Sequence, residues 1–183
     1  MIVKASEESV TAGKYLTFNL ADESYGLEIL RVQELVGLSA ITRVPRLPAF
    51  IAGVINLRGR VIPLVDLRLC FGMAGSAMDD RTCVIVVRVE RGKDHAAAMG
   101  VLVDEVSDVV YLAQDSIEPT PEFGTTVDTS FVKGVGRLED RVVLLLDIDR
   151  VLSSSELDAI AQAAGHTGDA AAAQEPDSEK NAN

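Results

Sequence analysis

The stretch Phe50–Leu67, FIAGVINLRGRVIPLVDL, decides the fold of this chain. Two apolar runs, Gly53–Leu57 and Arg60–Asp66, flank the short break Arg58-Gly59. The β-branched residues that fill both runs favour strands over helices. Glycine adopts the positive φ that a tight hairpin turn needs. The stretch therefore predicts a β-hairpin with Arg58 and Gly59 at its tip.

Further pairs of apolar runs separated by short polar breaks extend this pattern along the chain. Many short strands joined by tight turns predict a barrel or a sandwich. A parallel α/β sheet is excluded, because no helix of about 10–15 residues lies between successive strands. The predicted pairs are Tyr15–Leu20 with Tyr25–Ile29, Thr82–Glu90 with His95–Val103, and Phe131–Leu138 with Arg141–Ile148, and Asp104–Leu112 is predicted as one more strand.

Helical segments are expected to be few. Leu30–Val36 is predicted to form one or two helical turns, and Pro48–Ala52 a short turn. Asp149–Ala164 predicts a C-terminal helix, because Val151, Leu152, Leu157 and Ile160 form an apolar stripe. Asp149 is the natural N-cap of that helix, since a carboxylate accepts bonds from the first free N–H groups.

Charge and composition limit the function classes. The chain has 183 residues, a net charge of −11 and a pI near 4.6. Nucleic acids and anionic membrane surfaces are not expected as partners, because both are bound by clustered Lys and Arg. No apolar run reaches the roughly 20 residues that span a bilayer, and the N-terminus does not resemble a signal peptide. We expect a cytoplasmic protein without direct membrane insertion.

Three zones divide the chain. Residues 1–13 are polar and are expected to be a flexible N-terminus. Residues 14–164 form the expected folded domain, with two barrel subdomains by the resemblance described below. Residues 165–183 are rich in Ala and acidic residues and lack an apolar pattern. Such a segment cannot bury enough surface to become ordered, so we expect a disordered acidic tail.

No residues suggest catalysis, a cofactor or a metal. His95 and His166 have no serine or cysteine in a recognisable nucleophile setting. Cys70 and Cys83 lack partners at metal-ligand spacing. Asp147 and Asp149 form a DxD pair, which sometimes binds Mg²⁺ but here fits the start of a helix better. Glycine-rich phosphate-binding patterns are absent.

The hairpin tip is the one local candidate for recognition. Asn56 can bond to nearby backbone and stiffen the turn. Arg58 would then project from a rigid tip, where its planar guanidinium suits carboxylate recognition. A solvated hairpin with no special role remains the alternative from these residues alone.

Several stretches together strongly resemble the CheW family of chemotaxis adaptors, from about Tyr15 to Leu152. The resemblance is carried by YLTFNLADESYGLEILRVQELVG, ITRVPRLPAFIAGVINLRGRVIPLVDLRLCFG, VLVDEVSDVV, IEPTP and FVKGVGRLEDRVVLLLDIDRVL. It implies an all-β fold of two intertwined five-stranded SH3-like barrels, with short helices and a C-terminal helix. No receiver or kinase domain is recognisable, so neither CheV nor CheA is expected.

The resemblance also implies a function. CheW proteins couple methyl-accepting chemoreceptors to the CheA histidine kinase within receptor arrays, without catalysis and without a cofactor. The implied partners are the receptor's cytoplasmic tip, the kinase's CheW-like regulatory domain and other CheW copies. The positions that match the receptor surface are Val32, Glu34, Asn56, Arg58, Gly59 and the neighbouring Val61, and the kinase contact is expected near Ile41, Thr42 and Val44.

Two questions stay open at this level. Arg58 and Glu34 are expected either to pair with each other or to reach separately to the receptor. The adaptor itself belongs either to a chemotaxis pathway or to a receptor–kinase array for twitching or surface sensing. A small-ligand-binding barrel is a much weaker alternative.

Overall fold

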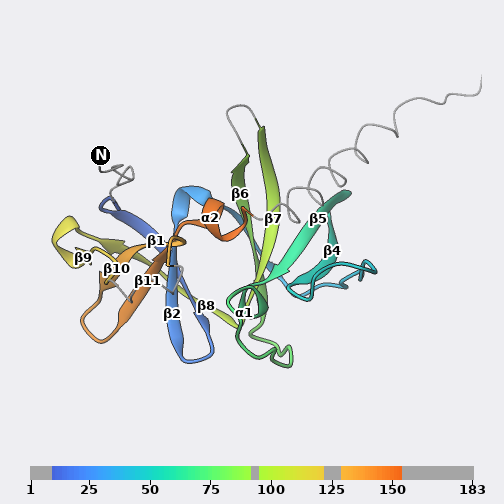
Figure 1. Ribbon diagram of the computed structural model, residues 1–183, viewed down its shortest axis with the longest axis horizontal. Helices are drawn as coiled ribbons and strands as arrows, with labels where there is room; N and C mark the ends of the chain where they lie inside the picture. Colours follow the sequence, from blue (N-terminus) through green and yellow to red (C-terminus); the bar gives the residue numbers. More distant parts are fainter. Residues whose placement is uncertain (1–9, 92–94, 122–128, 154–183) are drawn as a thin grey trace, which may run out of the picture.

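Two curled β-sheets lie side by side in the computed structural model of this protein, which describes residues 10–91, 95–121 and 129–153 (Figure 1). The first sheet has the strand order β8-β1-β2-β11-β10-β9. All its neighbouring pairs are antiparallel except β2 with β11, which is parallel. Its strands are β1 (Gly13–Leu20), β2 (Glu23–Glu28), β8 (Glu105–Leu112), β9 (Ile117–Glu118), β10 (Val132–Arg137) and β11 (Val142–Leu146).

The second sheet has the strand order β3-β6-β7-β5-β4, again antiparallel except for the pair β5 with β7. An isolated antiparallel bridge between Thr42 and Val54 joins the chain after β3 to β4, and so brings together the two edges of this sheet. Its strands are β3 (Val32–Gly37), β4 (Ile51–Leu57), β5 (Arg60–Asp66), β6 (Cys83–Arg91) and β7 (His95–Val103).

The two sheets are intertwined along the chain, and we call them the first and second barrel. The chain builds β1 and β2, crosses to the second barrel through the 3₁₀ turn η1 (Ile29–Arg31), and returns at Asp104, between β7 and β8. A further 3₁₀ turn, η2 (Gln114–Ser116), joins β8 to β9. The all-β class predicted from the sequence is confirmed, and the short strand β9 adds a sixth strand to the first barrel.

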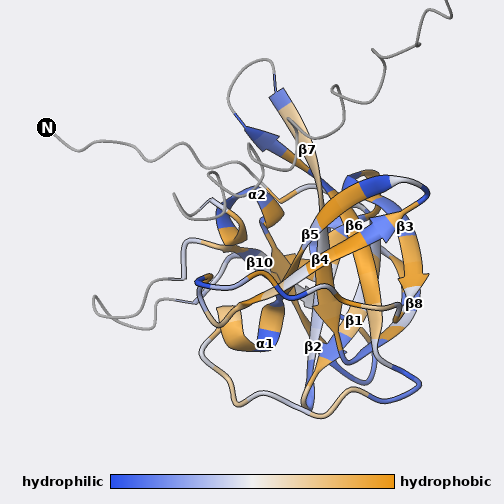
Figure 2. Cartoon of the chain, turned by 90° about the vertical axis from the view of Figure 1, so that its right-hand side faces the viewer, coloured by the Kyte–Doolittle hydropathy of each residue, from blue (hydrophilic) through white to orange (hydrophobic). Residues whose placement is uncertain are grey.

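Most strands are buried on both faces, which explains their nearly continuous apolar runs. In β6, Val84 and Val86 face the interior of the second barrel. Ile85 and Val87, which alternate with them, face the first barrel instead. In Figure 2 the strands β5 and β6 are largely orange, and blue is concentrated in turns and strand ends.

Three hydrophobic cores follow from this double burial. Each barrel has a small core of its own, and a larger core, which we call the shared core, lies between the barrels. The shared core consists of Leu16, Phe18, Leu20, Tyr25, Leu27, Ile51, Val65, Leu67, Ile85, Val87, Val89, Met99, Val101, Val103, Leu146, Ile148 and Leu152. The first barrel encloses Val10, Tyr15, Leu112, Val143 and Leu145, and the second encloses Ile55, Ile62, Leu64, Val84, Val86 and Leu102.

Two helical predictions need correction. Only Ile29–Arg31 is helical near the predicted segment Leu30–Val36, and Val32–Gly37 is the edge strand β3. Helix α2 (Ile148–Val151) is capped by Asp147, not by Asp149, because β11 ends earlier than expected, at Leu146. The Asp147 carboxylate accepts bonds from the N–H groups of Asp149 and Arg150. The predicted continuation of this helix beyond residue 153 lies outside the described residues.

The predicted zones can be compared with the structure at their boundaries. The flexible segment predicted for residues 1–13 extends too far, because Val10 is buried in the first barrel and Gly13 already opens β1. Residues 1–9 and the whole predicted tail, 165–183, lie outside the described residues. Within the part that is described, no helix is long and apolar enough to cross a membrane.

Candidate partner-binding site

The β4–β5 hairpin ends in the predicted two-residue turn. Leu57 pairs with Arg60, which leaves Arg58 and Gly59 at the tip. Their φ values are +52° and +84°, both positive, as type I′ hairpin turns require. The Gly59 N–H donates to Asn56 Oδ1 at 2.8 Å, which confirms the predicted side-chain support. The backbone at the tip is therefore fixed by local bonds.

Arg58 is bound to Glu34 on β3, across 24 residues of sequence. Its Nη2 donates to Glu34 Oε1 at 2.6 Å and its Nη1 to Oε2 at 3.3 Å. The Arg58 side chain is 78% exposed, whereas that of Glu34 is 28% exposed. Of the two readings left open by the sequence, the structure contains the mutual pair. The pair joins the hairpin tip to the edge strand and leaves most of the guanidinium facing solvent.

Val61 completes the surface around the tip. It lies opposite Asn56 in the β4–β5 register and is 45% exposed. Adjacency in the hairpin, strand pairing and the ion pair thus bring together five of the predicted residues: Glu34, Asn56, Arg58, Gly59 and Val61. We call these five residues the tip surface.

Val32 differs from the other predicted receptor positions. It is half-buried and packs against the shared core, and a β-bulge separates it from Glu34 in the pairing of β3 with β6. It therefore supports the seam between the barrels as well as the edge of β3.

The predicted kinase positions lie where the second barrel closes. Thr42 and Val54 exchange two backbone bonds, each of 2.9 Å. Ile41 packs against the second barrel's core, whereas Val44 is 40% exposed. A Cβ on Gly53 would lie 2.3 Å from the Thr42 carbonyl oxygen, so only glycine fits this closure. Thr42 and Val44 are both exposed and available to a partner, whereas Ile41 is half-buried.

Sequence reasoning missed exposed leucines near this region. Leu35 on β3 and Leu38 just after it are both exposed, and Leu30 on η1 is almost fully exposed. Side chains alternate between the two faces of β3, so Leu35 lies on the outer face, whereas Glu34 and Val36 lie on the other face and are half-buried. Recognising Val32–Gly37 as a strand would have identified Leu35 as an outward residue.

The candidates for chemistry have structural roles. Asp147 caps α2, and Asp149 accepts bonds from Arg31 and from the Glu90 N–H. Burial raises the pKa of the Cys70 and Cys83 thiols, which makes them poorer nucleophiles. Among the described residues, no three His, Cys, Asp or Glu side chains are grouped closely enough to hold a metal ion.

Comparisons with known proteins agree with this architecture. The family model of the CheW-like domain matches residues 14–156. The chemotaxis protein CheW of Klebsiella aerogenes is 42% identical over 144 residues, which cover 79% of this chain and 84% of that protein. The chemotaxis protein CheW of Rhizobium meliloti is 33% identical over 159 residues, covering 86% of this chain and 99% of that protein.

A solved structure shares the fold. The crystal structure of the scaffolding protein TtCheW from Thermoanaerobacter tengcongensis superposes with a TM-score of 0.69 at 35% identity. The match covers 80% of this chain and 96% of that chain. The family model covers both barrels and the whole tip surface, and the two relatives, at 42% and 33% identity, match over most of their own length. This chain therefore belongs to the CheW family of chemotaxis scaffold proteins.

Proposed function

We propose that this chain is a non-catalytic cytoplasmic adaptor that couples methyl-accepting chemoreceptors to a CheA-type histidine kinase. The observation that carries the proposal is the match of the CheW-like domain to residues 14–156, which include every described strand except the first residue of β1. Binding to the kinase recruits the adaptor to membrane-associated receptor arrays. Contacts between adaptor copies would extend such an array.

The tip surface is the proposed receptor contact. A rigid turn presents a guanidinium that already has its orientation set by Glu34, so little side-chain entropy is lost when a partner binds. Exposed Val61 supplies apolar area next to it. An arginine surrounded by apolar contact area is the typical composition of an interface hot spot.

The charge of this part of the chain favours an acidic partner segment. Residues 35–65 contain four arginines, Arg43, Arg46, Arg58 and Arg60, and no Asp or Glu. The chain as a whole carries a net charge of −11. A locally cationic segment in an acidic protein steers carboxylates toward itself.

The kinase contact is proposed near Ile41, Thr42 and Val44. Thr42 contributes through the backbone bridge that holds the loop, and Val44 contributes exposed apolar surface. The two proposed contacts are neighbours on the second barrel, because Thr42 pairs with Val54 on β4, two residues before Asn56 of the tip surface.

Two matched valine variants test this assignment. Val61→Asp and Val44→Asp both place a charge at an exposed valine, of 45% and 40% exposure, so neither should unfold the protein. In binding assays with a purified receptor cytoplasmic fragment and a purified kinase regulatory domain, Val61→Asp should weaken only receptor binding. Val44→Asp should weaken only kinase binding.

In the same assay, binding by the wild-type protein decides whether the adaptor proposal stands. Failure of the wild-type protein to bind both the receptor fragment and the kinase domain would refute the adaptor proposal. Binding only to receptors and kinases of a twitching or surface-sensing array would assign it to that pathway instead of flagellar chemotaxis, and the genes next to its own would be the quickest independent check.

A further inference from the structure

The chain passes between the two barrels twice, and each crossing carries an arginine–aspartate pair. The first crossing is η1, which contains Arg31, and the second is Asp104. Both charged residues are bound by residues of distant elements. These pairs do not belong to the tip surface, and their partners are far away in sequence.

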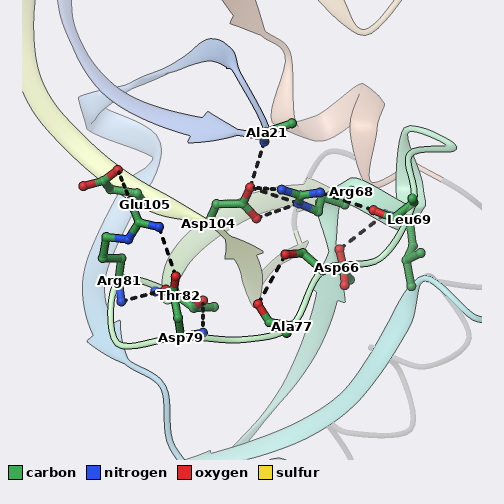
Figure 3. A network of polar contacts seen from close by, with 12 residues as sticks. Ala21, Asp66, Arg68, Leu69, Ala77, Asp79, Arg81, Thr82, Asp104 and Glu105 are labelled. Atoms are coloured by element: carbon green, nitrogen blue, oxygen red, sulfur yellow. Dashed lines mark hydrogen bonds and ion pairs between the residues drawn. The ribbon is translucent and has the colours of Figure 1, made fainter.

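At the second crossing, Asp104 joins three elements (Figure 3). Arg68 belongs to helix α1 (Leu67–Cys70), which follows β5 of the second barrel. Its Nε donates to Asp104 Oδ1 at 2.7 Å and to Oδ2 at 2.9 Å, and its Nη2 also donates to Oδ2. Asp104 Oδ2 further accepts the N–H of Ala21 at 2.7 Å, from the β1–β2 turn of the first barrel. One carboxylate thus ties both barrels to the crossing.

The backbone around Asp104 strengthens the same connection. The Asp104 N–H donates to the Asn19 carbonyl at 3.2 Å. Ala21 has a φ of +52°, a left-handed conformation that is unfavourable for alanine. Its N–H is held by Asp104, and this bond offsets part of that cost. Burial alone would raise the pKa of Asp104, but Arg68 and the Ala21 N–H hold that pKa below its usual value, so the carboxylate stays charged.

At the first crossing, Arg31 makes the equivalent connection. Its Nη2 lies 2.6 Å from Asp149 Oδ2, on α2 after the last strand of the first barrel. Its Nη1 lies 3.2 Å from Glu90 Oε1, on β6 of the second barrel. Asp149 Oδ1 also accepts the Glu90 N–H at 2.8 Å. Here too, one arginine and one aspartate join the two barrels, since they connect β6 of the second barrel to helix α2, which follows the last strand of the first.

The two sets of bonds lie at opposite ends of the seam. Figure 1 shows α2 and α1 separated along the boundary between the two sheets. The side chains of the shared core pack between these sheets. Apolar contacts in the shared core stabilise the protein in proportion to the buried area, and this stabilisation depends little on direction. Charged hydrogen bonds with a planar guanidinium are directional, and they fix an angle as well as a distance. Two such bonds at opposite ends restrict rotation of one barrel against the other.

We infer that the pairs Arg31–Asp149 and Arg68–Asp104 set the relative orientation of the two barrels, so that Arg31 and Arg68 act as positioning residues. If the proposed adaptor function holds, they also set how the second barrel, which carries both proposed contact surfaces, is oriented against the first barrel within an array. Among the described residues, the hydrogen bonds and ion pairs of these four side chains reach no residue of the tip surface.

The test replaces both aspartates by asparagine in the full-length protein. Asp104→Asn keeps an oxygen that can accept the Ala21 N–H, and Asp149→Asn keeps one for the Glu90 N–H, but both lose the charge that holds the arginine. Glu28→Gln is the matched control, because Glu28 pairs with Lys133 at 3.2 Å within the first barrel. The Lys133 and Glu28 side chains are 18% and 32% exposed, close to the 18% and 29% of Arg68 and Asp104.

The readout is the relative orientation of the barrels, measured by residual dipolar couplings in weakly aligned protein. Wild-type protein and the Glu28→Gln control should each fit one common alignment tensor for both barrels. The double asparagine variant should need a rotated or separate tensor for the second barrel. If the double variant does not fold, the Arg31→Lys and Arg68→Lys protein provides the measurement, since it keeps both charges but lacks the planar fork.

A double variant that keeps the wild-type orientation, and merely melts lower, as the control does, would overturn the inference. The couplings are measured without any partner, so they test the orientation independently of the adaptor proposal. Kinase activation in the assembled receptor–kinase complex, measured on the same protein, then separates the two ideas. Changed couplings with unchanged kinase activation would refute the link to function and leave the orientation role standing.

Discussion

The Nη2 atom of Arg58 lies 2.6 Å from Oε1 of Glu34, and this bond joins the tip of one hairpin to an edge strand of the same barrel. The two hydrogen bonds use two of the five N–H donors of the guanidinium. The remaining donors face solvent, since the Arg58 side chain is largely exposed. The pair therefore orients Arg58 without consuming its capacity to bind a partner carboxylate.

Arg58→Ala should leave folding nearly unchanged and weaken receptor binding. An exposed ion pair contributes about 0–1 kcal/mol to stability, so the melting temperature should stay close to that of the wild type. A hot-spot arginine contributes about 2 kcal/mol or more to binding, which corresponds to a loss of more than tenfold. Titration with a receptor fragment and a kinase-activation assay at limiting adaptor concentration measure this loss. Arg58→Glu should be more severe than alanine, because it repels both Glu34 and any partner carboxylate.

The exchanged pair separates orientation from direct contact. Glu34→Arg combined with Arg58→Glu can restore the bond between the two positions but reverses the charge at the tip. Recovered receptor binding would mean that the pair acts mainly by shaping the surface. Receptor binding that stays lost would mean that the partner binds the positive charge of Arg58 itself. An Arg58→Glu protein that activates the kinase as well as the wild type would remove Arg58 from the binding surface.

Gly53 and Gly59 should respond to alanine in different ways. At Gly53 an added Cβ meets the Thr42 carbonyl oxygen at 2.3 Å, and φ is +141°. The closing bridge between Thr42 and Val54 would have to open, so Gly53→Ala should cost at least about 3 kcal/mol of unfolding free energy. At Gly59 no atom lies within 4 Å of the added Cβ, and only the φ of +84° is unfavourable. Gly59→Ala should cost about 1 kcal/mol.

Gly13→Ala is the control for this comparison, because it has neither a close neighbour nor a positive φ. Denaturant unfolding of the three variants gives the free energies directly. Equal losses at Gly53 and Gly59 would show that closure by Thr42 tolerates movement, contrary to the contact described here.

The hairpins were predictable because their signals are local. In Phe50–Leu67 the turn residues and the apolar runs lie within a few positions of one another, and the structure places the turn at the predicted Arg58 and Gly59. The strand β3 was not predictable in the same way. Its apolar residues Val32, Leu35 and Val36 also fit helical spacing. The segment forms a strand because its backbone pairs with β6.

The polar connections between the barrels could not have been predicted from sequence pattern. Arg31 and Asp149 are separated by 118 residues, and Arg68 and Asp104 by 36. No periodicity relates such positions, because the contact depends on where two folded barrels meet. The family resemblance predicted that Arg58 and Glu34 share one surface, but that they bind each other follows only from the folded structure.

Val32→Asp and Val61→Asp should separate structural support from surface recognition. Val61 is exposed at the tip surface, so its replacement should change stability by about 0.5 kcal/mol or less. Val32 packs against the shared core, and a charge there should cost about 1–3 kcal/mol. Thermal unfolding and receptor binding measured in parallel should show a stability loss for Val32→Asp alone and a binding loss for both. An unchanged melting temperature for Val32→Asp would mean that its contact with the shared core is dispensable.

Salt should weaken receptor binding if the partner segment is acidic. The arginines Arg43, Arg46, Arg58 and Arg60 lie in a part of the sequence without Asp or Glu. Attraction between exposed charges is largely screened beyond the Debye length, which is about 8 Å at physiological ionic strength and shortens as salt is added. Raising the salt concentration should lower the association rate, and Arg60→Ala should reduce that dependence. An association rate that does not change with salt would rule out steering by this segment.

Lowering the pH should erase the difference in stability between the wild type and the Asp104→Asn variant. The pKa of Asp104 in the folded protein lies below its usual value: burial opposes the charged form, but the bonds from Arg68 and the Ala21 N–H outweigh it. A depressed folded pKa means that the stabilisation is fully present above the unfolded value of about 3.9 and is lost as the pH falls through the folded value. Thermal unfolding of both proteins should therefore show a constant gap, of about 1–2 kcal/mol for a charged hydrogen bond, from pH 7 down to about pH 5. The gap should narrow below about pH 4, because the protonated aspartic acid then binds Arg68 no better than asparagine does. A gap that stays constant to pH 3 would mean that the charge of Asp104 does not hold Arg68, and that the shape of the side chain alone accounts for its contribution.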